Sequence, residues 1–116
     1  MALLTRDQFL SAVDCNFDYV NVPEWGDIDS QIKIKSLSLI EQMACDKIDD
    51  KDVAMKAATV ISFGCINEDG SQFFNGPDDI PKLEEKSPSV VLRLFKAICK
   101  LSSINEDDIK EQSKNS

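Results

Sequence analysis

The stretch from Tyr19 to Ser38, YVNVPEWGDIDSQIKIKSLS, constrains the fold more than any other part of the chain. It begins with aromatic and β-branched residues and continues into a Pro-Glu-Trp-Gly segment, which is typical of a strand followed by a turn. Residues 31–35 (QIKIK) then alternate strictly, which predicts a second strand with Ile32 and Ile34 on one face and the lysines on the other. We therefore expect a β-hairpin near the N-terminus.

Two capping boxes predict where the first helices begin. In this motif a Ser or Thr and a Glu or Gln three residues later satisfy each other's backbone N–H groups. Thr5 with Gln8 predicts a short helix through about Val13, and Ser38 with Glu41 predicts a helix directly after the hairpin. The second helix carries apolar residues with a 3.6-residue period, which we expect to face the core: Leu39, Ile40, Met43, Ala44 and Ile48.

The second half of the chain predicts three further helices. Asp49 and Asp50 suit the start of a helix within 53–66, a stretch that is apolar nearly all round and therefore central, and Gly64 is expected to end this helix. Residues 77–86 predict a short helix. Ser87 and Pro88 then open the clearest helix, as N-cap and first helical residue. Its apolar face is expected to contain Val91, Leu94, Phe95, Ile98 and Leu101.

Together these elements predict an α+β fold that is predominantly α-helical, with the N-terminal β-hairpin packed on a core of four to five helices. A chain of 116 residues is close to the commonest size of a single domain. We expect residues 1–112 to form that domain. The polar end of the chain, from Ile104 onward, is expected to lose order, with 113–116 as a disordered tail.

The composition excludes several classes of partner and compartment. The chain has 21 acidic and 13 basic residues and a net charge of −8, which disfavours binding to nucleic acid or to anionic membranes. No apolar run approaches the ~18 residues that a membrane span requires. The four cysteines form no CxxC pair and no export signal accompanies them, which predicts reduced thiols in a cytosol.

The sequence predicts no catalytic, cofactor or metal site. It contains no histidine, so the commonest general base is absent, and the cysteine spacing matches no zinc pattern. Residues 67–70 (NEDG) resemble the middle of a calcium loop. However, such a loop would begin at Cys65 and end at Gly76, where a bidentate glutamate is required. Asp-Gly between apolar residues is instead typical of a hairpin turn.

Five residues are candidates for contact with a partner. Phe73 and Phe74 are adjacent, so in an extended segment only one can face the core, and the other becomes a surface anchor. Arg93, Lys96 and Lys100 form a basic stripe on the last helix. This stripe has two interpretations: a solvated face near the C-terminal end of the helix dipole, or a surface that contacts a partner.

A family resemblance is carried by several segments, taken in order: 4–8 (LTRDQ), 20–26 (VNVPEWG), 32–34 (IKI) leading into 37–38 (LS), 67–74 (NEDGSQFF), 83–87 (LEEKS), 91–95 (VLRLF), 101–102 (LS) and 106–109 (EDDI). Together these segments resemble the tail assembly chaperones of long-tailed (siphovirus-type) bacteriophages. The resemblance covers roughly residues 3 to 112.

The resemblance implies a non-catalytic assembly factor that coats and solubilises the tape measure protein before the tail tube polymerises around it. The tape measure protein would be its direct partner and the tail tube protein an indirect one, and weak self-association is implied as well. Such a protein acts in the cytoplasm of the host bacterium and is absent from the mature virion.

Two alternatives remain open at this point. The first is an acidic phage-encoded inhibitor, a nucleic-acid mimic that binds a host enzyme, which the net charge favours. Such mimics need regularly spaced carboxylates on one exposed face, whereas the acidic residues here cluster at helix starts, turns and the C-terminal segment. The second is a small cytosolic structural domain with no connection to a phage.

Overall fold

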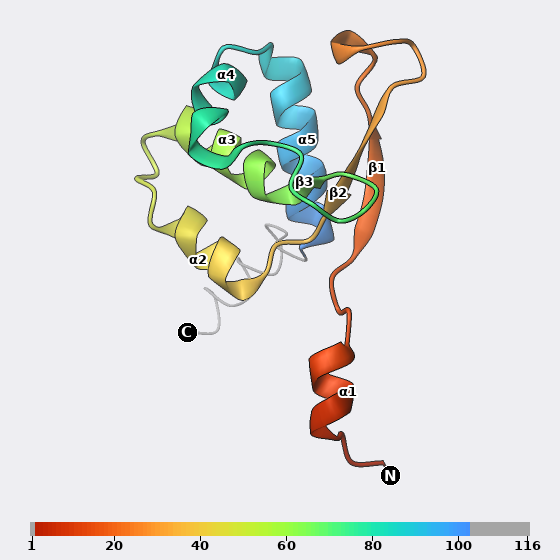
Figure 1. The fold of residues 1–116 in the computed structure, drawn as a ribbon. Coiled ribbons are helices and arrows are strands. Elements are labelled where there is room, and N and C mark those ends of the chain that lie inside the picture. Colours follow the sequence, from red (N-terminus) through yellow and green to blue (C-terminus); the bar gives the residue numbers. More distant parts are fainter. Residues whose placement is uncertain (1, 103–116) are drawn as a thin grey trace.

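A computed structural model describes residues 2–102 and has the expected α+β, mostly helical architecture (Figure 1). Expectations for residues 103–116, including the disordered tail, lie outside the described residues. The elements in chain order are α1 (Arg6–Ser11), β1 (Phe17–Asn21), the 3-10 turn η1 (Pro23–Trp25), β2 (Gln31–Lys35), α2 (Leu39–Asp46), α3 (Val53–Gly64), β3 (Cys65–Ile66), the 3-10 turn η2 (Gly76–Asp78), α4 (Ile80–Glu84) and α5 (Pro88–Leu101).

The predicted β-hairpin is present and forms two strands of a three-stranded antiparallel sheet. β1 pairs with β2 so that Val20 lies opposite Ile32, and β2 pairs in turn with β3. Ile32 and Ile34 are buried, whereas the lysines between and after them are more exposed, as the alternation predicts. The helix α3 ends at Gly64, as predicted, and the strand β3 replaces the apolar continuation that the sequence analysis counted with the helix as far as Ile66. Pairing with Lys33 and Ile34 of β2 takes these two residues out of the helix.

The core lies between the sheet and the crossing helices α3 and α5. α3 is the central element that its composition predicts, with most of its residues from Ala57 onward buried. α5 turns Val90, Leu94 and Ile98 fully inward, and the other residues of the predicted face are partly buried and pack against this core: Val91, Phe95 and Leu101. A Cβ atom added to Gly64 would lie only 2.5 Å from Cδ1 of Ile98, so the glycine permits the close approach of the two helices.

The helices begin at the predicted N-cap residue in three of four cases. Both capping boxes are formed, at Thr5 and at Ser38. α3 differs from the prediction because Asp52, rather than Asp49 or Asp50, caps it: the Asp52 carboxylate accepts a hydrogen bond from the amide of Met55 at 3.2 Å. At the start of α5, Ser87 is the N-cap residue with a proline after it, but its side chain caps no amide.

The turn at 67–70 is a hairpin turn, as the Asp-Gly signal predicts. The amide of Gly70 donates to the carbonyl of Asn67 at 2.9 Å, and Gly70 adopts a φ of +90°, which favours glycine. The chain then returns beside β3, where Gln72 bridges to Ile66. Among residues 2–102, no helix has the length and apolar character needed to cross a bilayer.

The apolar stripe of α2 faces outward, which contradicts the sequence prediction. Leu39, Ile40 and Met43 are exposed, and Cys45 is the buried residue of the helix. The rotation has a physical cause in the capping box, because the Glu41 carboxylate points to the end of β2 and Cys45 lies one turn further on the same face.

The first helix also departs from the expected core. α1 ends at Ser11, two residues earlier than predicted, and none of its residues is buried. It extends away from the rest of the molecule on an extended connection to β1 (Figure 1). Its apolar residues Phe9 and Leu10 are each more than 60% exposed within the described part of the chain.

Candidate partner-binding surface

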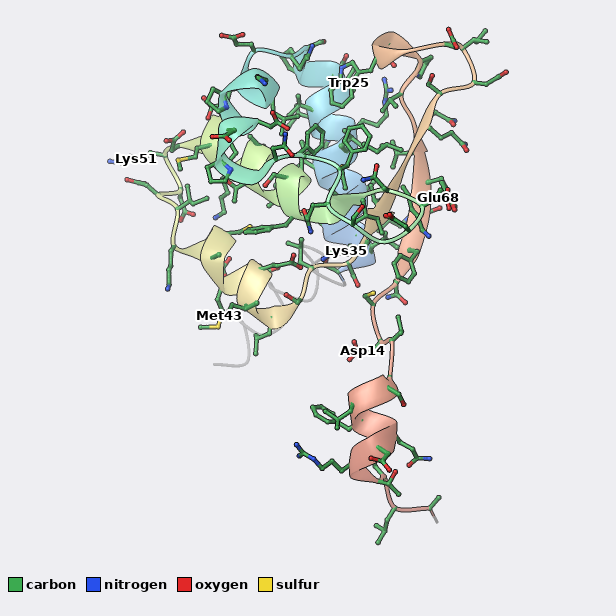
Figure 2. All side chains as sticks on the ribbon, in the orientation of Figure 1. Asp14, Trp25, Lys35, Met43, Lys51 and Glu68 are labelled. Carbon is green, nitrogen blue, oxygen red and sulfur yellow. The ribbon has the colours of Figure 1, made fainter. Side chains whose placement is uncertain are left out.

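Two helices, α1 and α2, present apolar side chains to solvent instead of to the core. Figure 2 shows the clearest case, Met43, whose side chain points away from the body of the molecule on the outer side of α2. We use the term α1–α2 surface for six exposed residues of α1, α2 and the segment after α1: Phe9, Leu10, Val13, Leu39, Ile40 and Met43.

A groove runs between the end of α1 and the start of α2. It is lined by Phe9 on one side, by Asp14 and Cys15 of the connection, and by the continuous segment 35–40. Its volume is about 850 Å³. The α1–α2 surface therefore includes a concave part, which a flat apolar patch does not offer to a partner.

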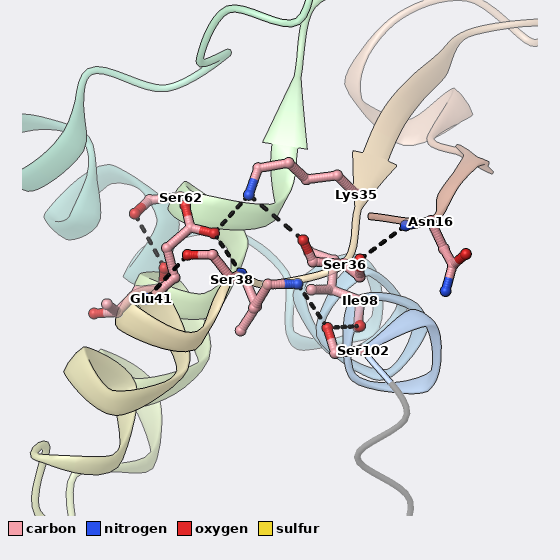
Figure 3. A network of polar contacts seen from close by, with 10 residues as sticks. Asn16, Lys35, Ser36, Ser38, Glu41, Ser62, Ile98 and Ser102 are labelled. Carbon is pink, nitrogen blue, oxygen red and sulfur yellow. Dashed lines mark hydrogen bonds and ion pairs between the residues drawn. The ribbon is translucent and has the colours of Figure 1, made fainter. Parts of the chain in front are cut away.

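Residues 35–38, which line this groove and are called its floor here, belong to a polar network (Figure 3). The Nζ of Lys35 lies 2.6 Å from Oε1 of Glu41, and the same oxygen accepts a hydrogen bond from the Ser38 amide at 2.9 Å. The ion pair is largely shielded, since the two side chains are 17% and 15% exposed. Paired and hydrogen-bonded charges of this kind hold the β2–α2 junction in one geometry.

The same network ties the groove to the end of α5. The Leu37 amide donates to Oγ of Ser102 at 2.9 Å, and that hydroxyl donates to the carbonyl of Ile98 at 2.8 Å. Asn16 and Ser36 exchange two further hydrogen bonds, each 2.9 Å long, across the start of β1. The floor of the groove is thus anchored to β1, β2 and α5, and the exposed side chains of α2 stand on a rigid base.

The charge of the protein is concentrated in the half that contains this surface. Residues 2–50 include ten acidic and four basic side chains, whereas residues 51–102 include seven of each. Two of the four basic residues, Lys33 and Lys35, already lie within ion-pair distance of a glutamate. The groove therefore lies in the acidic half of the molecule.

The two adjacent phenylalanines differ in exposure, as the sequence predicts. Phe73 is half exposed, while Phe74 is partly buried and packs against the core. Their ring centroids are 4.9 Å apart in an edge-to-face arrangement. Both rings line a smaller hollow of about 360 Å³, together with Trp25 and residues of α4.

The basic stripe lies elsewhere, on α5, and its members differ in what they contact. Arg93 makes a bidentate ion pair with Glu24 of the hairpin, with N···O distances of 3.0 and 2.7 Å, and also donates to the carbonyl of Asn21. These hydrogen bonds lower the pKa of Glu24 to about 2. Lys96 and Lys100 are exposed. The phenylalanines and the stripe thus line different parts of the molecule.

Cys45 and Cys65 belong to the core, Cys99 packs against it, and Cys15 lies at the groove. All four are free thiols, and burial raises the pKa of Cys45 to about 11 and that of Cys65 to about 12. Thiols with such pKa values are protonated at neutral pH and are poor nucleophiles. Within residues 2–102, no three His, Cys, Asp or Glu side chains are grouped so that they could hold a metal ion.

Comparison with known proteins relates the chain to one solved fold. No protein-family model matches the sequence, and no curated protein sequence matches it either. Among solved structures, the chain is similar to the tail assembly chaperone of bacteriophage HK97, with a TM-score of 0.64 and 18% sequence identity over 82% of this chain and 90% of that one. The resemblance found in the sequence is therefore confirmed at the level of the fold.

Proposed function

We propose that the protein is a non-catalytic phage tail assembly chaperone that coats and solubilises the tape measure protein before the tail tube polymerises. The observation that carries this proposal is the fold shared with the HK97 tail assembly chaperone over most of both chains. The protein would act in the cytoplasm of the host bacterium and be absent from the mature virion. The tail tube protein would meet it only indirectly, by displacing it.

Physical properties of the chain support this role. A long helical tape measure exposes apolar stripes that aggregate in water, and a small acidic protein that covers them adds electrostatic repulsion between coated chains. The coat must later come off, which favours modest interfaces over the large apolar interfaces of obligate complexes. Weak self-association along the tape measure is part of the same proposal.

We retain the five predicted contact residues in this proposal with different roles. Phe73, Lys96 and Lys100 are exposed and would touch the partner directly. Phe74 and Arg93 would support them, since the first packs beneath Phe73 and the second holds the hairpin to α5.

Co-expression tests the function. The tape measure protein is expected to be insoluble alone and to become soluble and co-purify when this chain is present. A tape measure protein that stays soluble alone and never co-purifies with the chain would refute the chaperone role. Mass spectrometry of purified virions is expected to find the tape measure protein but not this chain.

The basic stripe has its own test within the same assay. Charge reversal at Lys96 and Lys100 is expected to weaken capture, more strongly at low salt, because exposed charges are screened beyond about 8 Å at physiological ionic strength. Lys51→Glu is the matched control, since this lysine lies on the connection between α2 and α3 (Figure 2). Equal capture by the Lys96 and Lys100 variants and the control would identify the stripe as a solvated face.

The alternative function, an acidic inhibitor that mimics nucleic acid, draws support from the ten acidic side chains of residues 2–50. The same region exposes Leu39, Ile40 and Met43, which have no counterpart on a phosphate backbone. An enzyme groove evolved for DNA would leave these side chains against charged residues. The exposed apolar side chains therefore favour the chaperone over the mimic.

A further inference from the structure

We propose that the α1–α2 surface is the docking site for an amphipathic helix of the partner, one whose apolar stripe is flanked by basic residues. This inference rests on the proposed function, because the tape measure protein would supply the helix. It adds the place of binding and the chemistry of the bound segment. It also assigns a role to apolar residues that the core does not use.

The first argument is the exposure of residues that ordinarily stabilise a fold. α1 has only six residues and buries none of them among residues 2–102, although helices shorter than about 12 residues are marginal in water without tertiary packing. Leu39 and Ile40 on α2 are each 78% exposed. With Phe9 of α1 they line one groove, and exposed apolar side chains gathered in this way mark an interaction site.

The second argument is the shape of the surface. The groove has Phe9 on one wall, Leu39 and Ile40 on the other, and the hydrogen-bonded segment 35–38 as its floor. An amphipathic helix binds such a groove through side chains at positions i, i+3, i+4 and i+7. The groove, at about 850 Å³, also has more than twice the volume of the hollow beside Phe73.

The third argument is charge, and it selects the partner. Asp7, Asp14 and Asp46 are exposed on α1, the connection after it and α2, where Arg6 is the exposed basic residue. All of them lie within the half of the chain that has ten acidic and four basic residues. A second copy of this chain would bring the same acidic surface against itself, which costs free energy. A helix with basic flanks is attracted instead, and complementary charge also raises the association rate.

Two designed 20-residue helical peptides test the docking site without the tape measure protein. One has a leucine stripe flanked by lysines, and the other has the same stripe flanked by glutamates. The intact chain is expected to bind the lysine peptide and to bind the glutamate peptide at least tenfold more weakly, as measured by calorimetry. Ile40→Asp is expected to weaken binding of the lysine peptide at least tenfold.

Ile28→Asp is the matched control, because it adds the same charge at an apolar residue that is 87% exposed in the hairpin loop. It is expected to bind like the unmodified chain. Thermal melting of both variants checks that the fold is intact. The inference is refuted if Ile40→Asp binds as well as Ile28→Asp does, or if both peptides bind equally.

Co-expression with the tape measure protein separates this inference from the proposed function. Loss of capture with Ile40→Asp but not with Ile28→Asp supports both. Capture that survives Ile40→Asp but is lost with Phe73→Asp leaves the chaperone role intact and overturns the docking site. If Ile40→Asp dissociates an oligomer in sedimentation while binding of the lysine peptide is unchanged, the surface joins copies of this chain, and the inference is wrong.

Discussion

Replacement of Gly64 by alanine measures how closely α3 and α5 approach each other. An added Cβ would lie 2.5, 2.8 and 2.9 Å from three side-chain carbons of Ile98, which is fully buried. Overpacking of this kind costs about 1–3 kcal/mol. The better helix propensity of alanine offsets at most about 1 kcal/mol, and less at the last residue of a helix.

We therefore expect Gly64→Ala to reduce the free energy of unfolding by about 2 kcal/mol, which lowers the melting temperature of a domain of this size by roughly 8 °C. Ile98→Ala removes all three clashing carbons and by itself costs about 3 kcal/mol. In the double variant the smaller side chain at position 98 makes room for the added methyl group. The combined loss in free energy of unfolding should therefore be smaller than the sum of the two single losses by about 1 kcal/mol or more.

Urea denaturation of the chain, the two single variants and the double variant completes this mutant cycle. A Gly64→Ala variant as stable as the unmodified chain would show that the helices lie further apart than described. Strict additivity of the two losses would show that the clash is not with Ile98. Either result would contradict the packing that places α5, and with it Ser102, beneath the groove.

Two further predictions concern ion pairs that differ in burial. Glu41→Ala is expected to cost about 2 kcal/mol in urea denaturation, because it leaves Lys35 unpaired at 17% exposure and removes half of a capping box; a loss below about 0.5 kcal/mol would contradict the network. Glu24 has a pKa lowered from 4.5 to about 2, so its ion pair stabilises the fold above pH 4.5 and this contribution is lost as the pH falls towards 2. The difference in free energy of unfolding between the unmodified chain and Glu24→Gln, measured by urea denaturation, should become smaller over that pH range. A difference that stays constant would refute the ion pair between Glu24 and Arg93.

Local signals in the sequence predicted the local structure well. The alternation of residues 31–35 and the two capping boxes act over a few residues, and the structure contains the expected hairpin and both caps. The strand β3 was missed because two residues give no period, and only the pairing with β2 identifies them as a strand. Asp52 was missed as a cap because three acidic residues lie within four positions, and sequence alone does not rank them.

The candidate site could not be predicted in the same way. A 3.6-residue period shows that Leu39, Ile40 and Met43 share a face of a helix, but it does not say whether that face meets the core or solvent. The orientation depends on Lys35 and Glu41, which belong to different elements and meet only in the folded chain. Of the residues predicted to contact a partner, Phe73 is exposed as expected, while its role in binding stays a prediction.

The observed orientation of α2 leaves its apolar face in solvent, although burial of that face would stabilise the fold. Burial of three large apolar side chains would contribute about 1.5–3 kcal/mol each, so a helix rotated to bury Leu39, Ile40 and Met43 would gain several kcal/mol. That rotation would withdraw Glu41 from Lys35 and turn the face of Cys45 outward. Since the ion pair and cap together contribute about 2 kcal/mol, the pair alone does not outweigh this gain. Burial of Cys45, which is 2% exposed, favours the same orientation as the ion pair and the cap. A helix held in this orientation with its apolar face in solvent retains that face for a partner.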